Sequence, residues 1–200
     1  MLVKSYLYEI CISSCYRMIL LIGWLGTCIY LIGHAYISIV QGWEQKNYYT
    51  INLIAAICLI ISSLFNYSWQ AVMVNLFWMV ISILLLLNVN LTASKFTLKQ
   101  YYWVFGGFLV NFIMQSIYKQ EIDLASLGWI AAFVFSSVYL LLSAEKMLPR
   151  YYLLWNIFAA LALLPQLWVD QNWPVFGLEI SWAVISFYGA VRKFEQAHLI

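Results

Sequence analysis

The feature that most constrains the fold of this chain is an apolar segment that occurs twice in the sequence. Sliding residues 48–83 forward by 104 positions lays one copy on the other. The matched pairs are Tyr48 with Tyr152, Asn52 with Asn156, Ala55-Ala56 with Ala159-Ala160, Trp69 with Trp173, Trp78 with Trp182, and Val80-Ile81-Ser82 with Val184-Ile185-Ser186. Upstream, Gly23-Trp24 falls on Gly128-Trp129 with a shift of 105, so the copies differ by one residue in one connection. In a protein with several membrane spans, such repeats usually form two halves around a shared pathway.

Composition assigns the chain to the integral membrane proteins. Of its 200 residues 65% are hydrophobic and only 9% are charged, whereas soluble domains have about 25% charged residues. At about 20 residues per span, the chain has room for six to eight helices and no soluble domain. The ten cationic residues are scattered, so nucleic-acid binding has no basic patch to support it. The expected fold class is therefore an all-α, polytopic membrane protein.

Polar breaks in the sequence predict seven helices. Their expected ranges are 18–39, 48–65, 69–87, 101–118, 124–142, 151–168 and 174–191. The fourth is the least apolar, since it contains Gly106-Gly107, Asn111 and Gln115. Residues 1–17 are too few and too charged to cross a bilayer, and they are compatible with an interfacial helix.

The distribution of cations tests the number of spans. With seven spans, one side holds Lys46, Lys95, Lys99, Lys146, Arg150, Arg192 and Lys193, and the other holds Lys4, Arg17 and Lys119. If the fourth helix does not cross, that seven-to-three bias almost disappears. The positive-inside rule therefore favours seven spans with the amino terminus outside and the carboxyl terminus in the cytoplasm, in a bacterial inner membrane. This gives two parallel three-helix bundles, 18–90 and 124–200, joined by a linker helix within 91–123.

Polar residues that recur in both copies are the best candidates for a lined pathway, because polar groups in hydrocarbon are costly. Asn52 and Asn156 form one matched pair, and they can bind either a solute or a neighbouring helix. Asn75 and Glu179 form the second pair, each three residues before a shared tryptophan. Because positions i and i+3 share a helical face, Trp78 and Trp182 extend the candidate substrate site. Packing between helices is the alternative role for all of these residues.

The remaining chemistry-bearing residues form no recognisable catalytic or metal-binding set. His34 is the only histidine within a predicted span, and its counterpart in the second copy is Tyr139. No combination of serine, histidine and acid, no paired carboxylates and no glycine-rich phosphate loop is visible in the sequence. We therefore expect no enzymatic activity, no cofactor and no metal site.

Each copy resembles a small uncharacterised family of bacterial membrane proteins that are single three-helix units. The resemblance rests on Gly23-Trp24-Leu25-Gly26 through Trp78 to Ser82 in the first copy, and on Gly128-Trp129 through Trp182 to Ser186 in the second. The layout also resembles the SWEET and PQ-loop sugar transporters and the PnuC-type nicotinamide riboside transporters, with their three-plus-one-plus-three plan. Pro165-Gln166 reads as a PQ pair, although it lies on the second helix of its repeat. The SWEET resemblance implies that Asn75 and Glu179 line a solute pocket.

Together these patterns predict a carrier for a small, mostly uncharged polar solute such as a sugar, nucleoside or vitamin. Glu179 departs from the SWEET pattern, since a carboxylate could bind a cation or a proton instead, and we expect it to be protonated, paired or open to water. The alternative is a membrane scaffold or sensor subunit in which the polar residues only join helices. The expected partners are the lipid bilayer and the solute, and homo-oligomerisation is left open.

Overall fold

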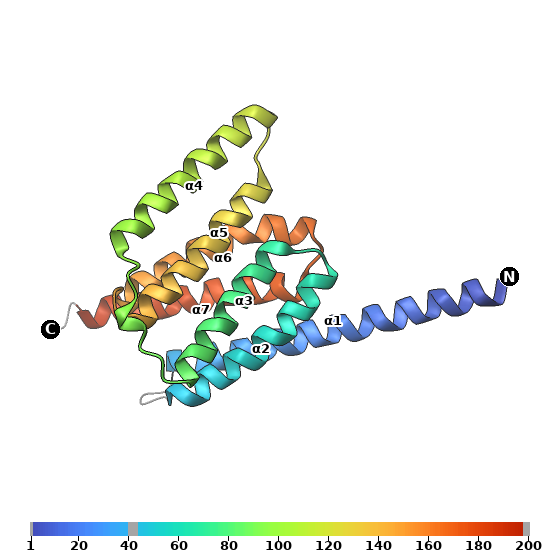
Figure 1. Cartoon of the computed structure of the whole chain (residues 1–200), viewed down its shortest axis with the longest axis horizontal. Coiled ribbons are helices and arrows are strands. Elements are labelled where there is room, and N and C mark those ends of the chain that lie inside the picture. Colours follow the sequence, from blue (N-terminus) through green and yellow to red (C-terminus); the bar gives the residue numbers. More distant parts are fainter. Residues whose placement is uncertain (1, 40–43, 198–200) are drawn as a thin grey trace.

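The computed structural model describes the backbone of residues 2–39 and 44–197, and the side chains of residues 14–36, 44 and 46–192. Every regular element in these ranges is helical (Figure 1). The elements are α1 (Leu2–Ile39), α2 (Gln45–Phe65), α3 (Trp69–Leu86), a short 3-10 helix η1 (Leu91–Ala93), α4 (Leu98–Lys119), α5 (Leu124–Ser143), α6 (Pro149–Val169) and α7 (Trp173–Ala197). The all-α class is confirmed, and the expected helices match within a few residues, apart from the start of α1 and the end of α7, which continues six residues beyond the expected Val191.

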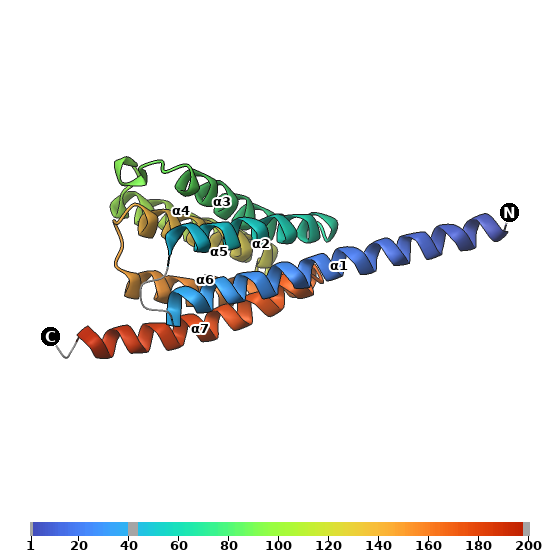
Figure 2. The same ribbon diagram turned by 90° about the horizontal axis from the view of Figure 1, so that it is seen from below.

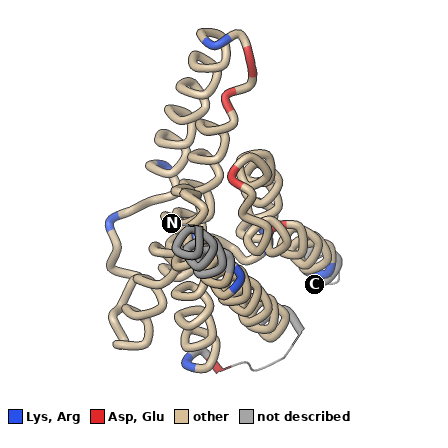
Figure 3. Tube along the Cα trace, turned by 90° about the vertical axis from the view of Figure 1, so that its right-hand side faces the viewer, with Lys and Arg blue, Asp and Glu red and all other residues tan. Residues whose placement is uncertain are grey.

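Six of these helices are long and apolar enough to cross a membrane: α1, α2, α3, α5, α6 and α7. In the described part of the chain most charged residues lie near helix ends and connections (Figure 3), whereas Arg17 lies within α1 and Glu179 within α7. Helix α1 has 38 residues and is therefore about 57 Å long, well beyond a bilayer core of about 30 Å. Its amino-terminal half extends away from the other helices (Figures 1 and 2). The region proposed as a separate interfacial segment, 1–17, thus continues α1 from Leu2, and most of its side chains lie outside the described residues.

The six spans form a closed ring. Helices pack in the order α1, α2, α3, α5, α6 and α7, and α7 packs against α1 to close it. The contacts of one repeat recur in the other, because α1–α2 corresponds to α5–α6, α2–α3 to α6–α7, and α3–α5 to α7–α1. Helix α4 lies outside the ring and packs mainly against α5 (Figure 1). The centre of the ring is therefore formed jointly by both repeats.

The two repeats also share an unusual backbone feature. Tyr67, in the turn between α2 and α3, has a φ of 53°, and Gln171, at the equivalent place between α6 and α7, has a φ of 54°. In each turn a bond of the Schellman type follows, from Ser68 N to Ser63 O and from Asn172 N to Leu167 O, both 3.0 Å. The duplication read from the sequence is thus visible in the left-handed residue that ends each second helix.

Glycines allow the helices of the ring to approach closely. A methyl group added at Gly23 of α1 would lie 2.8 Å from Pro174 Cγ of α7 and would also collide with the Ser62 side chain of α2. The equivalent Gly128 of α5 is less crowded, with Gln166 Cβ at 3.2 Å. At Gly106 of α4 the same methyl group would meet no heavy atom within 4 Å. Close packing therefore depends on glycine inside the ring and not on the linker helix.

The linker helix is fixed at both ends. At its start Thr97 and Gln100 form a capping box, with Thr97 N donating to Gln100 Oε1 at 2.8 Å. At the connection to α5, Lys119 Nζ lies 2.8 Å from Asp123 Oδ1, and Ser126 Oγ donates to the same carboxylate. These two partners hold the pKa of Asp123 below its ordinary value. The orientation of α4 along α5 is thus set by local polar contacts.

Candidate functional site

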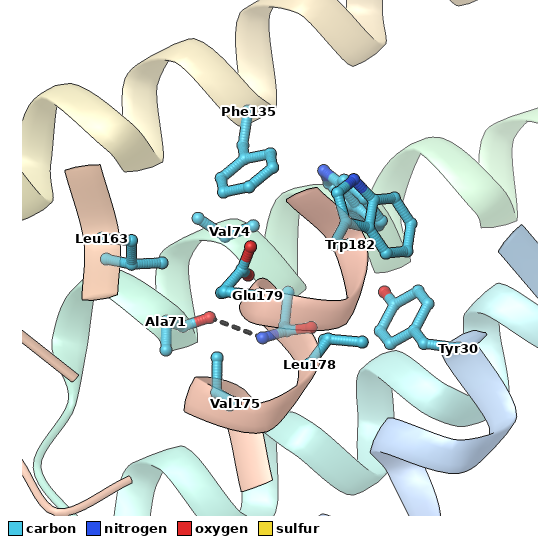
Figure 4. Close-up of a pocket in the computed structure, with 11 residues that line it drawn as sticks. Tyr30, Ala71, Val74, Phe135, Leu163, Val175, Leu178, Glu179 and Trp182 are labelled. Atoms are coloured by element: carbon cyan, nitrogen blue, oxygen red, sulfur yellow. Dashed lines mark hydrogen bonds between the residues drawn. The ribbon is translucent and has the colours of Figure 1, made fainter. Parts of the chain in front are cut away.

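A small cavity lies in the centre of the ring, between the repeats (Figure 4). Its lining comes from five helices: Tyr30 of α1; Ala71, Val74, Asn75 and Trp78 of α3; Phe135 of α5; Leu163 of α6; and Val175, Leu178, Glu179 and Trp182 of α7. The volume open to the centre of a water-sized sphere is about 10 Å³, which is room for about one water molecule. The structure is therefore closed around this site.

The matched pair Asn75 and Glu179 faces this cavity. Each side chain is about 95% buried, on the second turn of its helix. Asn75 Nδ2 donates to the Ala71 carbonyl oxygen of its own helix at 2.8 Å. The Glu179 side chain extends toward Phe135 (Figure 4), and its Oε2 atom has no hydrogen-bond partner among the described residues. The cavity therefore contains a carboxyl oxygen whose bonding capacity is unused.

Aromatic rings form most of the remaining wall. The centroids of Trp78 and Trp182 are 5.0 Å apart, and that of Tyr30 is 5.4 Å from Trp78. On its other face, Trp182 stacks on His34 at 3.7 Å and an interplanar angle of 16°. Both indole nitrogens and the Tyr30 hydroxyl lack hydrogen-bond partners within the described structure. Three residues with unpaired buried donors thus line the same cavity as the carboxyl group, and a buried donor without an acceptor is destabilising.

The other matched pair lies elsewhere in the ring. Asn52 of α2 and Asn156 of α6 are fully buried but do not line the cavity. Each lies one turn after a buried tyrosine, Tyr48 or Tyr152, and interacts with it. Of the six residues predicted to form the substrate site, the structure brings Asn75, Trp78, Glu179 and Trp182 together and leaves these two asparagines outside.

Tyr30 connects the two polar regions. Its hydroxyl interacts electrostatically with the Glu179 carboxyl group on one side and with the hydroxyls of Tyr48 and Tyr152 on the other. The Tyr139 hydroxyl of α5 also interacts with both of these tyrosines. Buried hydroxyl groups near the end of the ring where α2 and α6 begin therefore lie within electrostatic range of Tyr30 at the cavity.

Seven wall residues were missed by the sequence reasoning, and two of them are aromatic. Tyr30 and Phe135 occupy equivalent places on the first helix of each repeat, related by the same shift of 105 that relates Gly23 to Gly128. An aromatic ring at both places was a usable signal, but both residues resemble ordinary core aromatics. His34 and Tyr139, one turn later, are likewise equivalent and buried.

Hydrogen bonds join the repeats at the end of the ring formed by the turns 66–68 and 170–172, which we call the turn end. Ser68 Oγ donates to Asp170 Oδ2 at 2.6 Å, and Gln166 Nε2 donates to Asp170 Oδ1 at 2.6 Å. Asn172 Nδ2 donates to Ser63 Oγ at 3.0 Å. The bonds Ser68–Asp170 and Asn172–Ser63 link residues about one repeat apart in the sequence, so they close the cavity from this side, and Gln166 holds Asp170 in place from within its own repeat.

Replacing Asp170 with alanine is expected to weaken the turn end. The substitution removes the acceptor of Ser68, which is fully buried, and we expect a loss of about 1–2 kcal/mol in the free energy of unfolding. Denaturation of the purified protein in detergent measures this loss of unfolding free energy. Glu121→Ala is the matched control, because Glu121 is exposed and has no side-chain hydrogen bond in the described structure. Equal stability of the two variants would contradict a structural role for Asp170.

The described side chains include no group of three or more histidine, cysteine, aspartate or glutamate residues that could hold a metal ion. Neither the curated proteins nor the solved structures contain a match to the chain. One family model matches residues 19–94 and again residues 124–197, which confirms the internal repeat. Because the two matches cover well over half of the chain, the protein belongs to this family and carries its unit twice.

Proposed function

We propose that the protein is a membrane carrier for a small, mostly uncharged polar solute such as a sugar, nucleoside or vitamin. The observation that carries this proposal is the cavity between the repeats, where Asn75 and Glu179 lie beside Trp78 and Trp182. Carriers built from repeats often bind their substrate near the bilayer midplane at the interface of the repeats. An intramembrane carboxyl group is by default a candidate for function, because it is costly to keep.

The chemistry of the wall suits a neutral polar solute. The two indole nitrogens and the Tyr30 hydroxyl are unused donors, and Glu179 Oε2 is an unused polar atom. The hydroxyl groups of a sugar or nucleoside donate and accept, so they can pair with all of these groups. Aromatic faces can cover the apolar ring or carbon skeleton of the same solute.

We further propose that α4 also crosses, which gives seven spans in a three-plus-one-plus-three arrangement. Its 22 residues reach about 33 Å, enough for the bilayer core. Trp103, Val110 and Met114 are more than 60% exposed, as expected for side chains that face lipid. With α4 crossing, the cation bias places the amino terminus outside and the carboxyl terminus in the cytoplasm of a plasma membrane. The turn end then faces outward.

Transport requires the repeats to separate, because the closed cavity has room for about one water molecule. We propose that the repeats rock against each other around the Asn75 and Glu179 site. Opening to the outside would break the bonds of Asp170 and Asn172 at the turn end. Opening to the cytoplasm would part the buried tyrosines and asparagines at the other end. The same small volume is what favours the alternative, a scaffold whose ring never opens.

Uptake into liposomes that contain the purified protein distinguishes the two functions. A thermal-shift screen with sugars, nucleosides and vitamins identifies solutes that bind, since a ligand of the native state raises its apparent stability. For a solute found in this way, Asn75→Ala and Glu179→Ala are each expected to lower the uptake rate about tenfold, the cost of one lost polar contact of about 1.4 kcal/mol.

Asn111→Ala is the matched control for Asn75→Ala. Asn111 is exposed on α4, outside the ring, so this variant should transport at the normal rate. Normal uptake by both cavity variants would show that the solute binds elsewhere. A folded protein that takes up none of the solutes it binds would instead favour the scaffold.

A further inference from the structure

We propose that the Glu179 carboxyl group is the proton-binding site of the carrier, and that the repeats close around the cavity only while the proton is bound. This inference rests on the proposed function and names the coupling ion of the same site. A Glu179 carboxylate oxygen takes a proton from a hydronium ion on one side while the cavity is open there, so that one O–H bond of hydronium breaks, one O–H bond of the carboxyl group forms, and water is left. After the repeats have rocked, the carboxyl group returns the proton to a water molecule on the other side, which gives hydronium and the carboxylate.

Nothing in the described structure neutralises an ionised Glu179. Its neighbours include Val74, Phe135 and Leu163, and the polar groups around it are uncharged. The described lysines and arginines lie toward helix ends and connections (Figure 3), except Arg17 within α1. Arg17 is 13 residues before the cavity residue Tyr30, which places it about 20 Å away along the helix. The single ion pair found among the described residues joins Lys119 and Asp123, at the far end of the linker helix. A carboxylate in such surroundings is unfavourable unless a cation accompanies it.

The closed cavity has room for a proton on Glu179 but not for a metal cation. Hard cations need several oxygen ligands and more room than one water molecule occupies. Carriers that bind sodium supply such ligands from the carbonyl groups of unwound helices. Here α3 and α7 are continuous through Asn75 and Glu179, so their carbonyl groups remain in the helical hydrogen bonds. Glu179, Asn75 and Tyr30 alone would leave a metal ion undercoordinated.

Other titratable groups face this region, and His34 is the alternative to Glu179 as the group that binds the proton. Tyr30 and His34 come from α1, Tyr48 from α2, Tyr139 from α5 and Tyr152 from α6, and α3 contributes none. Tyrosines ordinarily keep their proton up to about pH 10. A histidine in water titrates near neutral pH, and the His34 ring stacks on the cavity residue Trp182. Asp170, the nearest acid of the turn end, is already bonded to Ser68 and Gln166.

Closure and protonation are linked through this one group. When the cavity opens, water solvates Glu179 and stabilises its carboxylate form. When the cavity closes, the neutral carboxyl form is favoured. By linkage, a conformation that favours the protonated form binds the proton more tightly and is itself favoured at low pH. The proton therefore biases the ring toward the closed arrangement, and Glu179→Gln, which mimics the neutral acid, should hold it there at every pH.

The test needs no transported solute. The four native cysteines are replaced by alanine, and Val74 on the cavity wall is replaced by cysteine. The protein is reconstituted in liposomes, and the rate of labelling by a water-soluble maleimide is measured from about pH 5 to about pH 9. This range covers the titration of buried carboxyl groups and of imidazole groups. Because thiol reactivity itself rises with pH, each rate is divided by that of the same cysteine in the Glu179→Gln protein.

We expect this ratio to be near one at low pH and to rise about tenfold or more at high pH, as the ionised carrier opens. His34→Gln should behave as the unsubstituted protein does. A ratio that stays flat, or a rise that disappears with His34→Gln, overturns the proposal. Addition of sodium at high pH should not restore slow labelling; if it does, the bound ion is a metal cation and the proton assignment is wrong.

Infrared difference spectra of the cysteine-free protein give a second measurement. Raising the pH should remove a carbonyl stretching band of a protonated carboxyl group, and that band should be missing in Glu179→Gln. Persistence of the same band in Glu179→Gln would refute the assignment. Failure here leaves the proposed function intact if Asn75→Ala still slows uptake, whereas normal uptake by Asn75→Ala and Glu179→Ala counts against the proposed site even when Glu179 binds a proton.

Discussion

Replacing Trp182 with alanine is expected to lower the free energy of unfolding by about 3–5 kcal/mol, the usual cost of deleting a large buried aromatic side chain. Trp182 is only 2% exposed and contacts His34, Trp78 and Tyr30. Its removal would leave a large hole at the centre of the ring, where five helices meet. Thermal or denaturant unfolding of the protein in detergent micelles measures the loss.

Trp103→Ala is the matched control, because Trp103 is 75% exposed on α4. We expect its effect on stability to stay within about 0.5 kcal/mol. If the Trp103 variant unfolded as readily as the Trp182 variant, the centre of the ring would not be the stabilising core. The comparison also separates the tryptophan that lines the cavity from one that faces outward.

The second large effect is expected from overpacking at Gly23. A valine there would push side-chain atoms into Ser62 and Pro174, which come from different helices and cannot both move away. Overpacking in a tight interior typically costs about 1–3 kcal/mol and occasionally more, and we place Gly23→Val at about 3 kcal/mol. The yield of folded monodisperse protein, together with its unfolding temperature, reports the change.

A graded series provides the control. Gly128→Val should cost less than Gly23→Val, because its nearest neighbours are the flexible side chains of Gln166 and Gln70. Gly106→Val should cost almost nothing, since the space beside Gly106 is open. The order Gly23, Gly128, Gly106 is the result to check, and a reversal would mean that the helices of the ring are not as close as described.

Most of the fold was predictable because short polar stretches in the sequence separate the apolar helices. Polar stretches such as Asn66 to Ser68 and Asp170 to Asn172 end one apolar helix and start the next, and the helices indeed end there. The start of α1 was not predictable in this way. Charged residues at Lys4, Glu9 and Arg17 interrupt the apolar pattern without interrupting the helix, since they have no effect comparable to proline or glycine.

The site was only partly predictable, for a different reason. A repeat shows which residues are equivalent, and equivalence does not require contact. Asn75 and Glu179 meet in one cavity, whereas Asn52 and Asn156 are just as equivalent and lie outside it. Tyr30 was overlooked because its role depends on where α1 lies against α7, and that contact between repeats leaves no trace within either copy.

The closed ring has a consequence for how such a protein can arise. The contact between α7 and α1 corresponds to the contact between α3 and α5, so one three-helix unit presents a surface that complements itself, as in an isologous dimer. Two identical units would place either two amides or two acids across the axis. Joining the units in one chain through α4 frees each half to change alone, and so the centre holds one acid, Glu179, facing one amide, Asn75. A single carboxyl group per ring avoids the like-charge repulsion that two would suffer.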